Sequence, residues 1–232
     1  MIGVIGAMEV EVGPLILEVQ NVTKRIVSGR VFHRGRLCGC DVVVVQGGVG
    51  KVNAAMSAEA MILEYRPELI VNVGVAGALT DALEIGDIAV ARDLVQYDVD
   101  STALGDPPGF VSTVGRVDFP CATWAVEGIA RALAKLDGIK ARVVRIASGD
   151  RFNDDPHTAG LIVDTFHADA CEMEACPIAQ VCFVNGVDCA VIRAISDSTA
   201  GSHSREYTLC RDEAARAAAR ALMAFLESLG EK

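Results

Sequence analysis

Seven runs of β-branched and small apolar residues predict strands. They cover residues 2–7, 40–48, 68–77, 86–95, 141–150, 168–174 and 188–197. Several of these runs are apolar at consecutive positions, which is typical of strands that are buried on both faces. The pattern therefore predicts a central sheet with helices packed against both sides.

Helical periodicity appears between these runs. The predicted helices cover residues 53–66, 122–138, 175–186 and 210–230. Strands that alternate with helices predict an α/β fold with a mainly parallel sheet. Residues 97–120 are the least regular part and predict a surface or interface loop, because they are rich in Gly and Pro. No linker or repeat interrupts the chain, so we predict a single domain over residues 1–232.

Polar side chains follow five of the predicted strands, at the edge where open α/β sheets bind ligands. These positions are Glu9 and Glu11, residues 47–51, residues 148–150, Glu172 with Glu174, and Ser196 with Asp197. Charged carboxylates are almost never fully buried without a partner. We therefore expect the five strand ends to converge on one binding site.

Composition narrows the set of partners. The 232 residues carry a formal net charge of -10. This charge argues against binding to nucleic acid or to an anionic membrane surface. No uncharged apolar run approaches the ~20 residues that span a bilayer, and the first residues show no export signal. The eight cysteines lie mostly among small apolar residues, which predicts free thiols and a cytoplasmic location.

Three motif matches fail on inspection. The stretch before Lys51 resembles a phosphate-binding loop, but Val45 replaces its first glycine and Val52 its hydroxyl residue. The first strand lacks the first glycine of a dinucleotide fingerprint. Cys38 and Cys40 are too close in sequence for a usual zinc pair. We therefore expect no metal and no cofactor.

The four histidines are scattered along the chain. We interpret His33, His157, His167 and His203 as surface or packing residues, with His203 the candidate nearest to the site because it follows Asp197 closely.

Three acids at strand ends are candidates for chemistry: Glu11, Glu174 and Asp197. Each alone has a structural interpretation, because acids stabilise helix N-termini and Asp is common in caps and turns. All three at one edge of a sheet, with Arg193 just before Asp197, favour a shared functional site instead.

Six motifs occur in order along the chain: GAMEVEV, GVGKVNAA, NVGVAGAL, SGDRF, CEMEA and VIRAISD. Together they resemble 5′-methylthioadenosine/S-adenosylhomocysteine nucleosidases, of the purine nucleoside phosphorylase/hydrolase superfamily. The resemblance extends from Met1 to the last predicted helix. It implies a three-layer α/β/α fold with a mixed, twisted central sheet, and a homodimer.

The resemblance also implies roles for five polar residues. Glu11 matches the base that activates water, and Asp197 matches the acid that protonates adenine N7. Glu174 matches the residue that binds the ribose hydroxyls, and we interpret Ser196 as orienting Asp197. Arg193 matches a residue that orders the acids and the water.

Apolar and aromatic residues complete the implied substrate site. Met173 and Met8 match positions lining it, Phe152 matches the ring that stacks near adenine, and Tyr207 lies where relatives keep an aromatic residue near the 5′ side. Val75 stands where many relatives have a serine near the water and sugar.

Other departures from the family pattern concern the base and the 5′ pocket. Asn153 replaces an apolar residue that is common after the aromatic one, and the 97–110 loop carries the sequence DVDSTALG, which resembles the family's interface loop. We expect this loop of a neighbouring subunit to lie near the 5′ pocket. The role of Glu172 is structural support or indirect contact.

Several functions remain open from the sequence. Water is favoured as the nucleophile, because the first loops carry Glu9 and Glu11 where phosphorylases place arginines. The alternatives are a nucleosidase for another 5′-modified or 6-substituted purine nucleoside, such as 5′-deoxyadenosine or futalosine, a phosphate-dependent phosphorylase, or a nucleoside sensor without catalysis.

Overall fold

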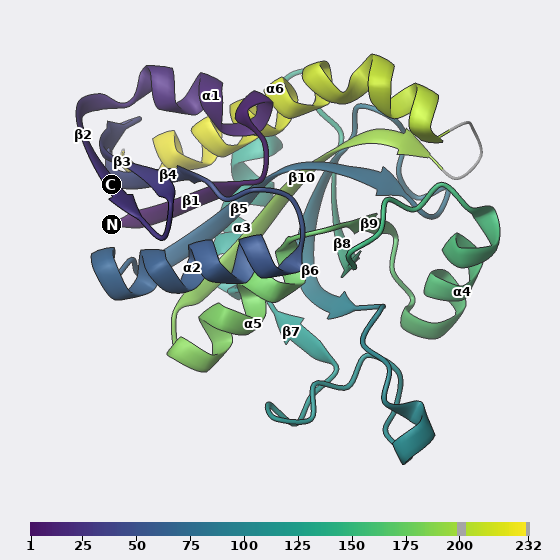
Figure 1. The fold of residues 1–232 in the computed structure, drawn as a ribbon. Helices are drawn as coiled ribbons and strands as arrows, with labels where there is room; N and C mark the ends of the chain where they lie inside the picture. Colours follow the sequence, from purple (N-terminus) through teal and green to yellow (C-terminus); the bar gives the residue numbers. More distant parts are fainter. Residues whose placement is uncertain (199–202, 231–232) are drawn as a thin grey trace.

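The structure is a computed structural model that describes residues 1–198 and 203–230. Ten strands and six helices form its framework (Figure 1). The strands are β1 (Ile2–Gly6), β2 (Gln20–Val27), β3 (Arg30–Leu37), β4 (Cys40–Gln46), β5 (Leu69–Ala78), β6 (Ile88–Gln96), β7 (Asp118–Pro120), β8 (Ala141–Ser148), β9 (Ala170–Glu172) and β10 (Asp188–Ser198). The helices are α1 (Glu9–Glu18), α2 (Lys51–Tyr65), α3 (Thr123–Leu133), α4 (Pro156–Phe166), α5 (Ala175–Asn185) and α6 (His203–Gly230), with a short 3₁₀ helix at Thr102–Leu104.

Helices cover both faces of the central sheet. On one side the long α6 packs against α1 and α3, and on the other α2 packs against α5 (Figure 1). The strand order is β10-β6-β8-β9-β5-β1-β4-β3-β2, with β7 beside β6. This arrangement confirms the three-layer α/β/α fold and its mixed sheet.

Five strands close into a ring, because β5 pairs with β10 as well as with β9. In the β5–β10 pair, the register shifts between Ile195 and Asp197, so that Ser196 is an extra residue in β10. Such bulges re-aim side chains and are frequent next to active sites. The carboxyl ends of β5 and β10 are therefore held side by side, with Asp197 opposite Gly77.

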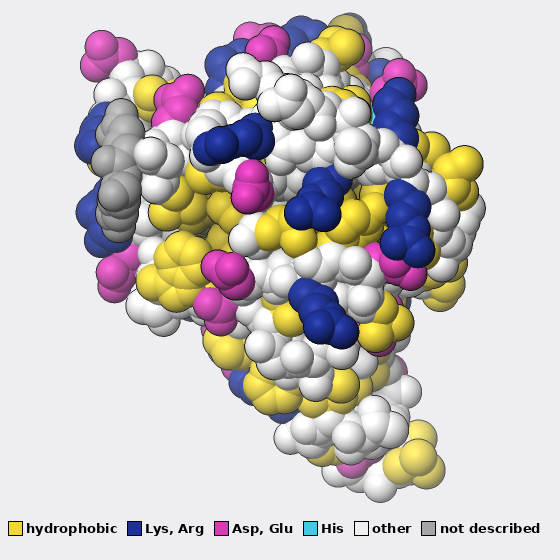
Figure 2. Space-filling view, turned by 90° about the vertical axis from the view of Figure 1, so that its left-hand side faces the viewer, with side chains coloured by type: hydrophobic (Ala, Val, Ile, Leu, Met, Phe, Trp, Pro, Cys, Tyr) yellow, Lys and Arg dark blue, Asp and Glu magenta, His cyan; other side chains and the backbone are white. Residues whose placement is uncertain are grey.

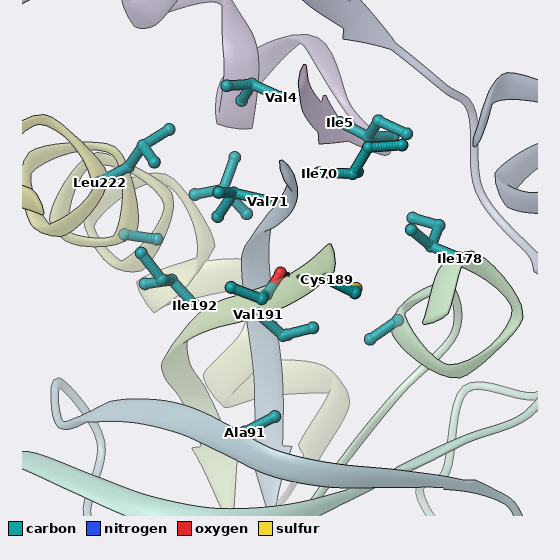
Figure 3. Close-up of a cluster of buried hydrophobic side chains, with 14 of the residues drawn as sticks. Val4, Ile5, Ile70, Val71, Ala91, Ile178, Cys189, Val191, Ile192 and Leu222 are labelled. Atoms are coloured by element: carbon teal, nitrogen blue, oxygen red, sulfur yellow. Dashed lines mark hydrogen bonds between the residues drawn. The ribbon is translucent and has the colours of Figure 1, made fainter. Parts of the chain in front are cut away.

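The core lies between the sheet and its helices. Val4, Val71, Ile192 and Leu222 are fully buried, and Figure 3 shows such side chains gathered between α6 and the central strands. All ten residues of β5 are buried. This two-faced burial is what the continuous apolar runs predicted.

The predicted elements are largely confirmed, with three corrections. The seven predicted strands and four helices are present, but two have other bounds. β9 has three residues, because the amides of Glu174 and Ala175 bond to the Glu172 carboxylate rather than to a neighbouring strand, and α6 begins at His203 rather than at residue 210. Among the described residues, five of the ten strand pairings are antiparallel, so the expectation of a mainly parallel sheet is wrong. The β2–β3 hairpin, α1 and α4 were not predicted, and residues 97–120 contain the short strand β7.

Two bulk properties complete the description. No helix in residues 1–198 and 203–230 is long and apolar enough to cross a bilayer. All eight cysteines are free thiols.

The packing of α6 gives a first prediction. Leu222 is fully buried against the sheet, whereas Leu209 in the same helix is 73% exposed. We expect Leu222→Ala to lower the free energy of unfolding by about 2–5 kcal/mol, because the lost methyl groups leave a cavity. Leu209→Ala is the matched control and should change it by at most about 0.5 kcal/mol. Urea unfolding measures both, and equal effects would contradict the packing described here.

Candidate active site

An open cavity lies at the carboxyl ends of the central strands, and its empty space amounts to about 570 Å³ when the open solvent at its mouth is included. Its wall comes from segments that are far apart in the sequence, namely Ala7, Met8 and Glu11, Val49, residues 75–77, 151–153 and 171–174, Ser196 with Asp197, and Tyr207. Three of the five polar strand ends meet in this wall at the edge where α/β sheets bind ligands, namely those that carry Glu11, Glu172 with Glu174, and Ser196 with Asp197. Residues 47–51 reach the wall only through Val49, and residues 148–150 do not line it.

Glu11 lies at the bottom of this cavity, on the first turn of α1. The amides of Ala7 and Met8 donate to its Oε2 at 2.7 and 2.9 Å, and the amide of Val75 donates to Oε1 at 3.1 Å. Glu11 is 1% exposed, and this burial raises its pKa although Arg193 and the three amides oppose the shift. The carboxylate is thus fixed in place and is a stronger base than an exposed glutamate.

Glu174 faces the same cavity from the start of α5. The amide of Gly50 donates to its Oε1 at 3.0 Å, and Arg193 Nη2 donates to its Oε2 at 3.4 Å. Burial raises the pKa of Glu174 to about 7, and the neighbouring Glu172 carboxylate adds to this shift while Arg193 opposes it. Glu174 can therefore accept hydrogen bonds as a carboxylate at neutral pH and above.

One buried guanidinium joins the carboxylates. Arg193, on β10, is 1% exposed and contacts Glu172 directly, with Glu174 at 3.4 Å and Glu11 at 3.9 Å. Burial alone would lower the pKa of Arg193, but the three carboxylates together raise it. The cluster therefore pairs one cation with three acids. Its net charge is negative when at least two of the three acids are ionised.

The backbone around Arg193 leaves it just enough room. Arg193 Nη1 donates to Val75 O at 3.3 Å, and Nη2 donates to Asn72 Oδ1 at 2.6 Å. A Cβ atom at Gly74 would collide with the guanidinium and with the Glu11 carboxylate. Only glycine allows β5 to pass this close to the ion cluster.

Glu172 supports the cluster and also touches the cavity wall. Its Oε2 accepts hydrogen bonds from the amides of Glu174 and Ala175, both at 2.8 Å, and its carboxylate also contacts Ser148 Oγ and Arg193. The role left open by the sequence is therefore visible. Glu172 caps the N-terminus of α5 and holds Arg193 in position.

Asp197 lies across the cavity, in the irregular part of β10. Ser196 Oγ donates to Asp197 Oδ1 at 2.7 Å, which agrees with the predicted orienting role of the serine. A Cβ atom at Gly77 would lie 2.7 Å from Asp197 Oδ2, so the glycine makes space for the carboxyl group. Asp197 is inside a strand, and the alternative of a capping or turn residue is therefore wrong.

The remaining wall is apolar and aromatic. Met8, Val75, Met173, Phe152 and Tyr207 all line the cavity, as predicted. Tyr207 Oη donates to Met8 Sδ at 3.4 Å, and its ring meets Phe152 edge to face at 5.3 Å between centroids. Val75 presents its apolar side chain and a buried amide to the site rather than a hydroxyl group. This half of the cavity suits a flat, weakly polar ligand.

Acidic side chains bind the backbone amides and the lysine of the glycine-rich turn before α2. The amide of Lys51 donates to Asp150 Oδ1 at 2.7 Å, and the Lys51 ammonium pairs with Asp98 Oδ1 at 2.6 Å. The amide of Gly50 is already bonded to Glu174. Carboxylates therefore hold the groups with which a phosphate-binding loop would bind phosphate.

Several lining residues were not recognised as site residues in the sequence. Cys171 and Arg151 line the cavity, and Asn72 supports Arg193. Cys171 and Asn72 lie inside apolar runs, so that their pattern signals only a buried strand. Asn153, noted as a departure from the family pattern, also lines the cavity.

The three histidines whose side chains the structure describes take no part in this wall. His33, His157 and His167 do not line the cavity, and the side chain of His203 lies outside the described residues. Within the described part of the chain, no group of three or more His, Cys, Asp and Glu residues could hold a metal ion.

Comparisons with known proteins agree with this geometry. A family model described as the phosphorylase superfamily matches residues 1–227. The chain belongs to this superfamily. A 5′-methylthioadenosine/S-adenosylhomocysteine nucleosidase of Shewanella sp. (strain W3-18-1) is 40% identical over 198 residues, covering 85% of both chains. This degree of likeness also makes the chain a member of that nucleosidase family.

Solved structures show the same fold. The nucleosidase of Neisseria meningitidis, in complex with methylthio-immucillin-A, aligns with a TM-score of 0.93 and 30% identity over 98% of each chain. A futalosine hydrolase mutant of Helicobacter pylori aligns with a TM-score of 0.92 and 30% identity, over 97% of this chain and 98% of that one. Structural likeness alone therefore does not distinguish these two activities.

The raised pKa of Glu174 gives a prediction about stability. Its pKa is about 7 in the folded protein against about 4.5 in the unfolded chain, so the folded protein binds more protons between these values. The contribution of Glu174 to stability is therefore present below pH 4.5 and is lost as the pH rises to 7. We expect Glu174→Gln to become more stable relative to the parent protein by about 2 kcal/mol between pH 5 and pH 7.5, since one pKa unit corresponds to about 1.4 kcal/mol.

Urea unfolding at the two pH values measures this difference. Glu9→Gln, at an exposed acid on α1, is the control and should show no such change. A constant difference between Glu174→Gln and the parent protein at both pH values would contradict the assignment.

Proposed function

We propose that this chain hydrolyses the N-glycosidic bond of 5′-methylthioadenosine and S-adenosylhomocysteine, releasing adenine and the thioribose. The observation that carries the proposal is the meeting of Glu11, Glu174 and Asp197 in one cavity, with Glu11 and Glu174 both beside the buried Arg193. Membership in the nucleosidase family supports it. On this proposal, residues 1–232 act as one catalytic domain.

The proposed reaction uses each acid once. Asp197 donates a proton to N7 of adenine as the C1′–N9 bond breaks, and the bonding electrons leave with the base. The ribose then has oxocarbenium character, which nearby negative groups stabilise. Glu11 accepts a proton from water as the water oxygen attacks C1′. Glu174 accepts hydrogen bonds from the ribose hydroxyl groups, and Arg193 holds Glu11 and Glu174 at fixed positions.

The other wall of the cavity fits the rest of the substrate. Phe152 offers a ring face beside adenine, and Ser196 orients Asp197. Met173, Met8 and Val75 contact the sugar, and Tyr207 borders the 5′ substituent. No metal or cofactor is needed for any of these steps.

Water suits the site better than phosphate as the nucleophile. A phosphate dianion would lie next to Glu11 and Glu174, and two unit charges 4 Å apart repel by about 1 kcal/mol even in water. The amides of Gly50 and Lys51 are bonded to carboxylates instead of being available to an anion. These contacts support a hydrolase over a phosphorylase.

Activity in the absence of phosphate tests the proposal. Purified protein should release adenine from 5′-methylthioadenosine in phosphate-free buffer, and Asp197→Asn should lower kcat by about 10²–10⁴-fold because the departing base loses its acid. Asp164→Asn, on the exposed surface of α4, should retain full activity. Circular dichroism checks that each variant is folded.

A strict requirement for phosphate would show that the protein is a phosphorylase and not a hydrolase. Tight nucleoside binding without release of base would make it a sensor instead.

A second candidate is hydrolysis of another 5′-modified or 6-substituted purine nucleoside, such as 5′-deoxyadenosine or futalosine. The likeness to the futalosine hydrolase structure favours it. So do Val75 and Asn153, which both change the lining of the cavity. Relative kcat/KM values for these nucleosides and for 5′-methylthioadenosine would separate the two candidates.

We propose further that the protein acts as a cytoplasmic homodimer. The eight free cysteines support a reducing compartment. The segment between β6 and β7 projects from the body as a lobe at the lower end of Figure 1, and Figure 2 shows hydrophobic side chains at its tip. Leu104 in this segment is 86% exposed. Such exposure in a projecting loop is typical of a surface that a partner covers.

The partner surface would begin at the mouth of the cavity. Val49 lines the cavity and is 48% exposed, and Val52, Met56 and Leu63 continue from it along one side of α2. These residues repeat at helical spacing, so they form one apolar stripe. A second copy that covers this stripe would place its 97–110 loop near the 5′ pocket.

The dimer has a direct test. Val52→Glu combined with Met56→Glu should convert the protein to a monomer and reduce its activity, because buried charges at the stripe oppose association. Leu17→Glu introduces one charge at an equally exposed position on α1 and should leave the dimer intact. Light scattering coupled to gel filtration measures the mass. A monomeric parent protein with full activity would contradict the dimer proposal.

A further inference from the structure

The side chain of Asn153 is buried without satisfying its hydrogen-bonding groups. Asn153 is 6% exposed, and neither its Oδ1 nor its Nδ2 has a hydrogen-bond partner. Its contact with the neighbouring Cys171 thiol does not meet the geometry of a hydrogen bond. Most buried polar groups in proteins are paired, so an unpaired carboxamide in a binding cavity calls for a ligand.

The position of Asn153 is fixed from both sides. At the start of its loop, the amide of Asp150 donates to Asp98 Oδ2 at 2.8 Å, and Tyr97 Oη donates to Arg151 O at 3.2 Å. At its end, Asp155 caps α4 by accepting from the amides of His157 and Thr158. The loop is thus held in place, and the unpaired amide is part of the folded site.

The surroundings of Asn153 indicate which part of a ligand it would meet. Asn153 lines the cavity together with Phe152 and Asp197. Asn153 contacts Cys171, and Gly77 on β5 pairs with both Cys171 on β9 and Asp197 on β10. Asn153 and Asp197 therefore lie on the same side of the cavity, with the Cys171 thiol near both.

Purine chemistry then assigns the contact. A purine presents N7 and its 6-substituent on the same edge, as N7 with an amino group in adenine and as N7 with an oxo group in 6-oxopurines. A group near the residue that serves N7 is within reach of the 6-substituent. A carboxamide can accept from an amino group through Oδ1 or donate to an oxo group through Nδ2.

We propose that the Asn153 carboxamide hydrogen-bonds the 6-substituent of the purine and makes the site selective for purines that carry a 6-amino or a 6-oxo group. This inference rests on the proposed nucleosidase function for the placement of N7 at Asp197. It means that the site accepts both 6-amino and 6-oxo purines, since rotation of the amide exchanges donor and acceptor. An apolar residue at this position would offer neither.

Two substitutions separate the donor from the acceptor. Asn153→Asp keeps an acceptor for the 6-amino group and removes the donor for the 6-oxo group, with almost no change of shape. Asn153→Leu removes both at similar volume. Asp154→Asn, the exposed neighbour in the same loop, is the matched control for a change of charge.

The primary measurement is calorimetric binding of free adenine, hypoxanthine and unsubstituted purine, which needs no turnover. We expect Asn153→Asp to weaken hypoxanthine at least about tenfold relative to adenine, because an unpaired buried group opposes binding. Asn153→Leu should weaken adenine and hypoxanthine about ten- to hundredfold while changing unsubstituted purine less than about threefold. The ratios of kcat/KM for 5′-methylthioadenosine and its 6-oxo counterpart should shift in the same directions.

The inference is overturned if the ratio of adenine to hypoxanthine affinity is the same in Asn153→Asp, Asp154→Asn and the parent protein. Equal weakening of all three bases by Asn153→Leu would also overturn it. If Asn153→Leu does not fold, the nearly isosteric Asn153→Asp decides alone. A different outcome is a parent protein that releases no base from any nucleoside, with Asn153 variants that still shift the ratio of adenine to hypoxanthine affinity. That outcome would refute the proposed hydrolysis and would support the role of Asn153 in base recognition.

Discussion

The buried guanidinium of Arg193 is the interaction on which the site depends. It contacts Glu172 and lies within 4 Å of both Glu174 and Glu11, at 1% exposure. Removing one partner of a buried ion pair commonly costs about 3–5 kcal/mol, because the other charge is left buried and unpaired. The four groups therefore hold one another in place. Gly74 makes their close packing possible, since any side chain there would collide with Arg193 and Glu11.

This arrangement prepares the charge distribution before a substrate arrives. Backbone amides and Arg193 fix Glu11 and Glu174, so that on the proposed function little reorganisation would be needed when positive charge develops on the sugar. Burial raises the pKa of both carboxyl groups, which makes them better proton acceptors than exposed glutamates. Asp197 is separated from this cluster, on the bulged end of β10 beside the aromatic wall. On the proposed function, the acid for the base and the carboxylates for the sugar therefore come from different parts of one cavity wall.

The sequence predicted the parts of this structure that carry a strong local pattern. The continuous apolar runs located the central strands, and polar residues after them located the cavity. The β2–β3 hairpin was not predicted, because β2 is almost wholly exposed and has no apolar face. Helix α1 was not predicted because Pro14 lies inside it. Helix α4 could have been predicted, because Asp155 at its N-cap is followed by a proline. The support from Asn72 depends on contacts across β5 and β10, which no local pattern contains.

On the proposed function, the buried carboxylates of Glu11 and Glu174 make this cavity complementary to a positively charged, ribose-like centre. The most direct test of this complementarity is the binding affinity of two nucleoside analogues that differ only in the sugar ring, one with a protonated ring nitrogen and one with a neutral ring. We expect the cationic analogue to bind at least about 100-fold more tightly, and Glu11→Gln to remove most of this preference. Equal affinities for the two analogues in the parent protein would contradict this complementarity.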